Sequence, residues 1–173
     1  MLSEKMEAAL NEQIKWEIYS AYLYLSMSAY FEDLGLEGFA HWMKAQTAEE
    51  LMHAMKFYKF VNERGGRVRL QEIPKPPEEW DSPLACLEYG LNHEREVTRR
   101  INDLMSFAKK EGDHATEIFL QWFVSEQVEE EDSFGRLVNQ MKLVKDSPQG
   151  LFHIDRELAA RPLDLNLLAQ GLA

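Results

Sequence analysis

Apolar side chains recur every three or four residues through four long stretches of the chain, which cover about residues 3–32, 37–63, 82–112 and 113–145. This spacing places the apolar residues of each stretch on one face of an α-helix. No stretch alternates apolar and polar residues with the period of two that is typical of a β-strand. The pattern therefore predicts an all-α protein built from four long amphipathic helices.

Residues that favour helix ends stand at the borders of these stretches. Ser3, Ser82 and Asp113 each precede a stretch, and serine and aspartate are preferred N-cap residues. Pro83 follows Ser82 at the first helical position, where a proline is tolerated. Glycines, which favour the end of a helix, follow the first three stretches, at Gly35, Gly65, Gly66 and Gly112.

A shorter fifth segment begins at Ser147 and Pro148, again a cap followed by proline. Its apolar residues form one helical face, made of Leu151, Ile154 and Leu158. We expect the four long helices to form a bundle over residues 1–146 and this short helix to cover residues 147–161. Residues 162–173 form an apolar tail with no evident partner.

The connections between the helices constrain the topology. Only a few residues join the first helix to the second and the third to the fourth, so each pair should form an antiparallel hairpin. The segment GGRVRLQEIPKPPEEWDS, residues 65–82, is long and rich in proline. Extended, it could reach roughly 60 Å, whereas a helix of about 28 residues is only about 40 Å long. The predicted fold is therefore a four-helix bundle with one long crossover plus a short fifth C-terminal helix.

Each long helix interrupts its apolar stripe with polar residues near its middle. The stripe positions, taken at steps of three and four, are Leu10, Ile14, Glu17, Ala21, Tyr24, Ser28 and Phe31; Phe39, Met43, Gln46, Glu50, His53, Phe57 and Phe60; Leu84, Leu87, Leu91, Glu94, Thr98, Ile101 and Met105; and Leu120, Phe123, Gln127, Glu130, Phe134, Leu137 and Met141. One glutamate of each stripe lies within about three residues of its helix midpoint, roughly 5 Å along the axis. In an aligned bundle these four carboxylates share one layer.

Four buried carboxylates require compensation, because desolvating one unpaired charge costs several kcal/mol and the charges also repel one another. Protonation, buried Lys or Arg partners, and metal ions are the three alternatives. The stripes contain no Lys or Arg, and protonation would require several strongly raised pKa values in one small volume. Glu50 and His53, at i and i+3, present a carboxylate and an imidazole on one helical face. The pattern favours two divalent cations.

Composition narrows the kind of metal and the kind of partner. Cys86 is the only cysteine, so we expect neither a disulfide within the chain nor a thiolate metal site. Carboxylates with one imidazole suit iron(II) or manganese(II), although zinc can also occupy such sites. A net charge of −11 disfavours nucleic acid and anionic membranes and attracts cations. No secretory signal or membrane-length apolar run is evident, which predicts a cytoplasmic protein.

Several charged residues are expected to play no part in such a site. The remaining histidines lie off the stripes and are predicted to be surface residues; they are His41, His93, His114 and His153. Glu131 and Asp132 are predicted to lie on a solvated face.

At these residues the chain resembles ferritin of the haem-free bacterial and archaeal type, over nearly its whole length. The stretches that carry the resemblance are EIYSAYLYLSMSAYF, EELMHAMKF, PPEEWDSPL and FLQWFVSEQVEEE. The resemblance implies that Glu17, Glu50 and His53 hold one iron. It also implies that Glu94 and Glu130 hold a second, with Glu50 bridging the two.

The same resemblance assigns roles around this pair of sites. Gln127 stands where ferritins place a polar residue near the second iron, and Tyr24 where they place a tyrosine beside the centre. Three further acids match the third, flanking iron site of bacterial ferritins, and these are Glu49, Glu126 and Glu129.

Ferritins assemble into hollow cages, usually of twenty-four subunits, that oxidise iron(II) with dioxygen and store the iron(III) mineral. The resemblance therefore implies a ferroxidase and iron-storage function in a homo-oligomeric cage. The fifth helix fits the segment that packs around the four-fold axes. The alternatives are a di-iron oxidase or peroxidase that does not store iron, and a non-catalytic bundle whose polar layer fixes the helix register.

Departures from related patterns sharpen the expectation. The fourth helix lacks a second Glu-x-x-His motif, so the centre should be asymmetric. Leu51 stands directly after Glu50, where haem-binding bacterioferritins carry a methionine, and no haem is expected. Near the start of the fourth helix Glu117 is followed one turn later by Leu120 rather than a second acid, which leaves open where iron enters a cage.

Overall fold

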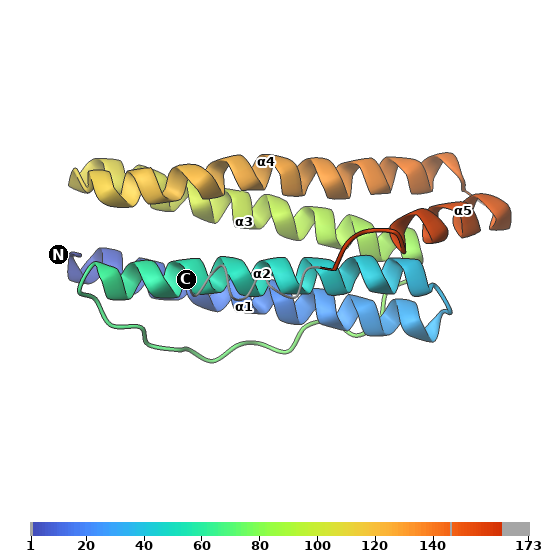
Figure 1. Ribbon diagram of the computed structural model, residues 1–173, viewed down its shortest axis with the longest axis horizontal. Coiled ribbons are helices and arrows are strands. Elements are labelled where there is room, and N and C mark those ends of the chain that lie inside the picture. The colour runs from blue at the N-terminus through green and yellow to red at the C-terminus, as the bar shows by residue number, and fades with distance from the viewer. Residues whose placement is uncertain (1, 146, 164–173) are drawn as a thin grey trace.

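A computed structural model describes residues 2–145 and 147–163 of the chain. These residues form the helices α1 (Glu4–Asp33), α2 (Glu37–Glu63), α3 (Pro83–Glu111), α4 (His114–Leu143) and α5 (Pro148–Leu158), and they include no β-strand. Figure 1 shows α1 to α4 as a bundle, with α5 at one end. The predicted fold class is confirmed.

The helices begin at the predicted caps. The side chains of Ser3, Ser82, Asp113 and Ser147 each accept a hydrogen bond from a backbone N–H in the first turn of α1, α3, α4 and α5. Gly112 ends α3 in the left-handed region at φ 66°, which a residue without a Cβ adopts at little cost. These ends could be predicted because caps act on neighbouring residues in the sequence.

Helix α2 has no cap of its own, because its N-cap residue is Leu36. The Asp155 carboxylate of α5 supplies one instead. Its Oδ1 accepts hydrogen bonds from the backbone N–H groups of Gly38 (2.8 Å) and Phe39 (3.1 Å). This contact, between residues far apart in the sequence, attaches α5 to the start of α2.

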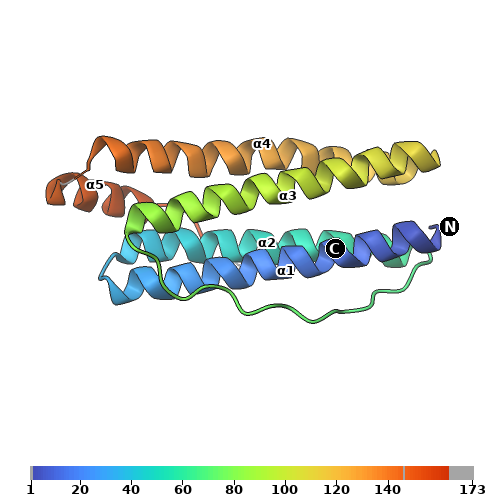
Figure 2. The ribbon, with the colours of Figure 1, turned by 180° about the vertical axis from the view of Figure 1, so that it is seen from behind.

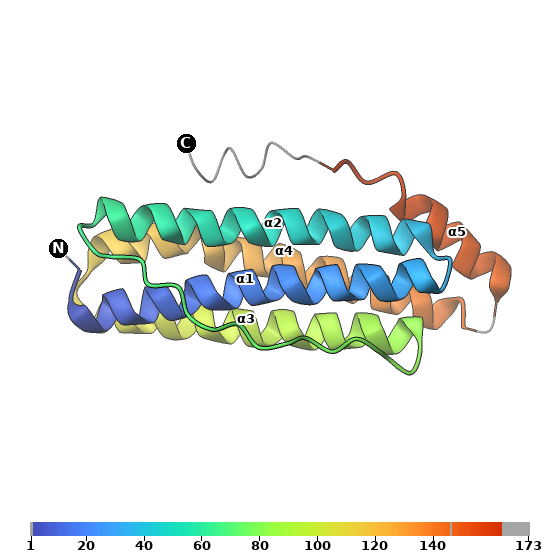
Figure 3. The same cartoon turned by 90° about the horizontal axis from the view of Figure 1, so that it is seen from below.

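The crossover between α2 and α3 runs along the bundle beside α1, as Figures 2 and 3 show. Polar groups of α1 hold it in place. The Asn11 side chain bonds to the backbone of Arg67 and Arg69 (3.0 and 2.6 Å), and Ser26 donates to the carbonyl of Pro77 (2.6 Å). The connection spans the length of the bundle, as its number of residues predicts.

The core consists of two hydrophobic clusters separated by polar residues. One cluster fills the half of the bundle that includes Tyr24, Phe31 and Phe134, and the other fills the half that includes Leu10 and Phe57. In each of the four long helices, the stripe glutamate lies in sequence between the residues of one cluster and those of the other. The apolar halves therefore frame a buried polar layer at mid-height.

Within the described residues, no helix is both long and apolar enough to cross a membrane. The predicted tail, residues 162–173, lies outside the described residues except for 162 and 163. The proposed division into bundle, short helix and tail stays a prediction.

Candidate metal centre

The polar layer is almost completely shielded from solvent. Exposure is 1% or less for Glu17, Glu50, His53 and Glu94, and 5% for Glu130. All four helices contribute to the layer, because each places one glutamate on its inward face. The predicted convergence of the four carboxylates in the bundle core therefore matches the structure.

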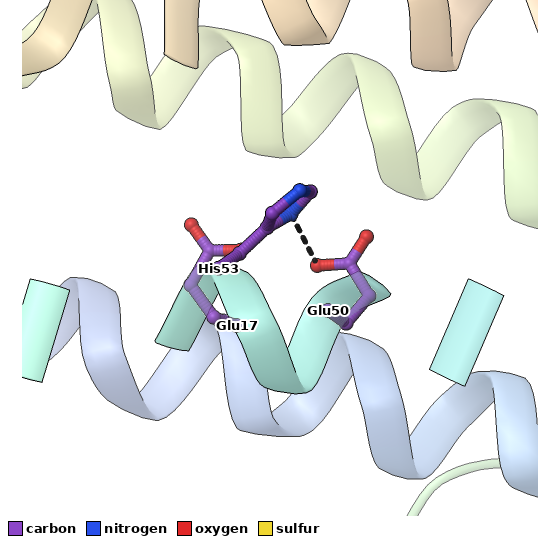
Figure 4. A group of neighbouring side chains, drawn as sticks. All are labelled: Glu17, Glu50 and His53. Carbon is purple, nitrogen blue, oxygen red and sulfur yellow. Dashed lines mark ion pairs between the residues drawn. The ribbon is translucent and has the colours of Figure 1, made fainter. Parts of the chain in front are cut away.

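Three of these residues form a compact group at the α1–α2 side of the layer. The His53 Nδ1 atom lies 3.4 Å from Glu50 Oε2 and 3.9 Å from Glu17 Oε2. Figure 4 shows the three side chains pointing from α1 and α2 toward the interior. One donor atom from each lies within 4.8 Å of the others, an arrangement that could hold a single ion. The Gln13 amide donates to the other Glu17 oxygen (2.8 Å) and fixes that carboxylate.

The glutamates of α3 and α4 are held by hydrogen bonds from neighbouring side chains. Tyr24 OH donates to Glu94 Oε1, and Gln127 Nε2 donates to Glu94 Oε2 at 3.1 Å. Gln46 Nε2 donates to Glu130 Oε2 at 2.7 Å. Tyr24 and Gln127, singled out from the sequence, thus contact a carboxylate of the layer.

Two potential metal-ligand atoms of the layer have no hydrogen-bond partner. These are Glu50 Oε2 and His53 Nε2, both fully buried. A buried polar atom without a partner costs about 1–3 kcal/mol, more when it is charged. A carboxylate oxygen and an imidazole nitrogen are both metal ligands, so a cation could satisfy atoms that the protein alone leaves unpaired.

Burial shifts the proton affinities of the layer strongly. Desolvation raises the pKa of Glu94 to about 7, against hydrogen bonds from Tyr24 and Gln127 that lower it. Desolvation and the neighbouring Glu94 raise the pKa of Glu130 to about 8. The pKa of Glu50 also rises well above its usual range through burial, which the His53 imidazole only partly opposes.

The pKa of the His53 imidazole is raised as well. Burial alone would lower the pKa of His53, but the carboxylates of Glu50, Glu126 and Glu17 outweigh it and raise this pKa well above its usual value. Without metal, the layer therefore holds extra protons at neutral pH. The raised pKa values favour protonation of these acids when no metal is bound, because burial outweighs the hydrogen bonds that they accept.

The metal-free protein is expected to lose stability as the pH rises from about 6.5 to about 8. The groups whose pKa is raised bind more protons in the folded than in the unfolded state across this pH window. The free energy of unfolding therefore falls as the pH rises. Each extra proton that the folded state holds across this pH window lowers the free energy of unfolding by about 2 kcal/mol. The window lies above the usual pKa of histidine, so His93, whose pKa is lowered, does not oppose the trend.

Thermal unfolding at several pH values, with and without saturating zinc(II), measures this effect. Metal binding releases the protons, so the metal-bound protein should gain stability relative to the metal-free protein as the pH rises. Glu130→Gln, which cannot ionise, should flatten the metal-free curve. A metal-free melting temperature that rises across the window would contradict the assignment.

The three flanking acids occupy different environments. Glu126 Oε1 lies 3.8 Å from His53 Nε2, and a donor atom of Glu126 falls within 4.8 Å of donors of His53 and Glu130. Glu49 is paired with Arg161 at 2.5 Å. Glu129 is exposed and joins neither group of described ligands. His53 thus presents Nδ1 to the first group and Nε2 to the flank.

Three expectations about residues outside the site are wrong. His93, predicted at the surface, is half-buried, bonds to Ser20 Oγ (2.8 Å), and packs edge-on against Tyr19 and Tyr24. Its burial lowers its pKa to about 4. His93 lies off the stripe of its helix, but the neighbouring aromatic rings of α1 cover it.

Glu131, expected on a solvated face, is half-buried because it accepts a hydrogen bond from Thr98 Oγ1 (2.6 Å). Of the other predicted surface residues, His41 is half-buried, while His114, His153 and Asp132 are exposed.

Three contacts in or beside the layer were not predicted from the sequence. Gln13 lies four residues before Glu17, a helical spacing that could have indicated their hydrogen bond. Gln46 bonds to Glu130 of a different helix, and no local spacing indicates that contact. Arg161 reaches Glu49 from beyond α5, and no local pattern could have indicated it.

The fold and the layer together define a class of protein, a four-helix bundle with a buried group of carboxylates and one imidazole that could hold metal. Residues 7–144 match the family described as Ferritin, Ferritin-like domain. The chain belongs to the ferritin family. Membership supports iron storage and iron oxidation as its general function, with iron as the metal.

Individual relatives agree with this assignment. A bacterial non-heme ferritin of Bacteroides fragilis is 44% identical over 161 residues, which cover 93% of this chain and all of the relative. One of Staphylococcus haemolyticus is 40% identical over 164 residues, 95% of this chain and 99% of that protein. The resemblance to the haem-free type is confirmed.

Solved structures agree as well. An open pore ferritin from the hyperthermophilic archaeon Archaeoglobus fulgidus has a TM-score of 0.93 and 54% identity, covering 94% of this chain and 100% of that one. An engineered closed form of the ferritin from that archaeon gives a TM-score of 0.94 with 53% identity, over 95% of this chain and 100% of that one.

Proposed function

We propose that each subunit oxidises iron(II) with dioxygen at a pair of iron sites in the polar layer, and that the subunits assemble into a cage that stores the iron(III) mineral. The observation that carries the proposal is that two buried potential ligand atoms, Glu50 Oε2 and His53 Nε2, lack a hydrogen-bond partner within a layer of carboxylates. Such an arrangement is costly unless protons or a cation compensate it, and a cation can also contact the two atoms that lack a partner.

Each residue of the layer has a role in this proposal. Glu17, Glu50 and His53 would hold the first iron, which their mutual distances support. Glu94 and Glu130 would hold the second, with Glu50 shared between both ions. Carboxylate-rich ligand sets with one imidazole suit iron(II), and a pair of such ions can supply two electrons to one dioxygen molecule.

Neighbouring side chains would position these ligands. Gln127 and Tyr24 each hold one oxygen of Glu94, so this carboxylate must exchange hydrogen bonds for metal when the second iron binds. Gln46 does the same for Glu130. The first group needs no such exchange at Glu50 Oε2, and we expect the first ion to bind before the second.

A third iron would bind at the flank, on Glu49, Glu126 and Glu129. The short distance between Glu126 and His53 supports a path from the centre to this flank. The absence of haem and the cytoplasmic location both stay predictions.

The cage would contain twenty-four subunits. The attachment of α5 to α2 through Asp155 supports this, because it fixes a helix at the end of the bundle where four-fold contacts are expected. Acidic subunits repel one another, so assembly should be favoured by salt, which screens the net charge of −11.

Gel filtration and one addition of iron(II) in air test the proposal. We expect metal-free protein at moderate salt to run as a shell of hundreds of kilodaltons and to turn amber on iron addition. A small oligomer that consumes dioxygen without retaining iron would indicate the di-iron oxidase alternative. No colour beyond the buffer control would indicate a structural bundle.

A further inference from the structure

Arg161, just beyond α5, stands at the boundary between the polar layer and the flank. Its Nη2 atom contacts Glu49 Oε2 at 2.5 Å, and its Nη1 atom donates to Gln46 Oε1, also at 2.5 Å. Its guanidinium carbon lies 5.2 Å from the centre of the Trp42 ring. One cationic side chain thus joins a flanking carboxylate to an amide that contacts the layer.

The second contact determines how Gln46 is oriented. Guanidinium can only donate hydrogen bonds, so Gln46 must present its carbonyl oxygen to Arg161. The amide nitrogen then faces the layer, where it donates to Glu130 Oε2 at 2.7 Å. Arg161 therefore acts on the layer through Gln46, and on the flank directly.

The ion pair with Glu49 is neither fully exposed nor fully buried. The Arg161 and Glu49 side chains are 25% and 27% exposed. Partial shielding makes the pair stronger than one in open solvent, while exposure leaves it within reach of an ion. Glu49 is consequently neutralised by the protein itself when no metal is bound there.

The chain around Arg161 is tethered as well. Its backbone carbonyl contacts the His41 Nε2 atom at 2.7 Å, and Asp155, six residues earlier, caps α2. Both tethers hold the guanidinium close to Glu49 without involving any iron ligand. The cation is thus supplied at a fixed place and at high effective concentration.

We propose that Arg161 is a built-in competitor for the flanking site, a tethered cation that occupies Glu49 until a metal ion displaces it. The inference rests on the proposed function, because it concerns the third ion of that site. Two consequences follow. Arg161 lowers the affinity of the flank for iron relative to the centre, and binding of the third ion releases the segment that carries Arg161.

Anaerobic calorimetric titration with zinc(II), which has no redox chemistry, tests the first consequence. Wild type should bind two ions more tightly and a third more weakly. Arg161→Gln removes the charge but keeps a polar side chain, and should raise the affinity of the weak step by about three- to tenfold, the range expected for a partly exposed ion pair. Arg161→Lys, which keeps the charge, should stay close to wild type.

Hydrogen–deuterium exchange of residues 150–163 tests the second consequence. Zinc(II) at the third equivalent should speed exchange there in wild type, whereas Arg161→Gln should already exchange quickly without zinc. Circular dichroism of each variant verifies its fold.

The outcomes separate the two proposals. An unchanged or weaker third step in Arg161→Gln, with both tighter steps present, would overturn the competitor role and leave the proposed function standing. Absence of the two tighter steps from wild type would overturn the proposed function, and the inference with it.

Discussion

Glu50→Ala is expected to abolish the rapid phase of iron oxidation, because Glu50 would serve both ions of the centre. Wild type should show a rapid phase that saturates near two iron(II) per subunit, since the layer offers four carboxylates and one imidazole. Stopped-flow absorbance with stepwise additions of iron(II) measures the amplitude. We expect the amplitude to fall at least tenfold in Glu50→Ala. His53→Ala should chiefly weaken the binding of the first ion.

A matched control is available on the same helix. Glu63→Ala removes an equal charge from an exposed position at the end of α2, far from the layer in sequence. Its rapid phase should equal that of wild type. Equal amplitudes in wild type and Glu50→Ala would mean that the Glu50–His53 pair is not the site of oxidation.

Gly38→Ala is expected to detach α5 and to prevent assembly of the shell. A Cβ at Gly38 would lie 1.7 Å from the backbone oxygen of Asp155 and 2.9 Å from its Oδ1, so α5 could not stay in place. The first backbone N–H groups of α2 would lose their acceptor, at a cost of about 1–3 kcal/mol if they stay buried. Burial of Ile154 would be lost with them.

The sign of the stability change distinguishes this effect from helix propensity. Alanine favours a helix over glycine by about 1 kcal/mol, so an isolated α2 would gain stability from the same change. Gly135→Ala on α4 is the control, because a Cβ at Gly135 would meet nothing within 4 Å beyond the backbone of its own helix. We expect thermal unfolding to show a lower melting temperature for Gly38→Ala only, and gel filtration to show its failure to form the shell.

A full-sized shell of normal stability from Gly38→Ala would show that α5 is not needed where the structure places it. Asp155→Ala adds a second test, since it removes the acceptor without a steric clash. Its effect should be in the same direction and smaller, because the remaining contacts of α5 stay intact.

The layer links proton and metal binding in a way that bears on function. Burial raises the pKa values of Glu94, Glu130 and Glu50, so these acids favour protons when no metal is bound. Iron must displace these protons, so its affinity should increase with pH. Protonation therefore limits the destabilisation that these buried acids impose on the metal-free subunit.

The four long helices, the caps of α1, α3 and α4, and the polar layer all follow from the sequence alone. Helix period and capping depend on residues a few positions apart, so Ser3, Ser82 and Asp113 could be placed correctly without a structure. The four glutamates could be aligned because two hairpins and one long crossover leave the bundle little freedom of register. Their shared position near the helix midpoints then follows from counting residues.

The contacts across and beside the layer, in contrast, depend on how the helices pack. Asp155 caps α2 from 117 residues away, and Arg161 pairs with Glu49 across 112 residues. No periodicity relates such positions, because the contacts depend on where α5 docks and on the directions of individual side chains. The raised pKa values of the layer also depend on the tertiary structure, since the carboxylates are desolvated only once the two apolar clusters close around them.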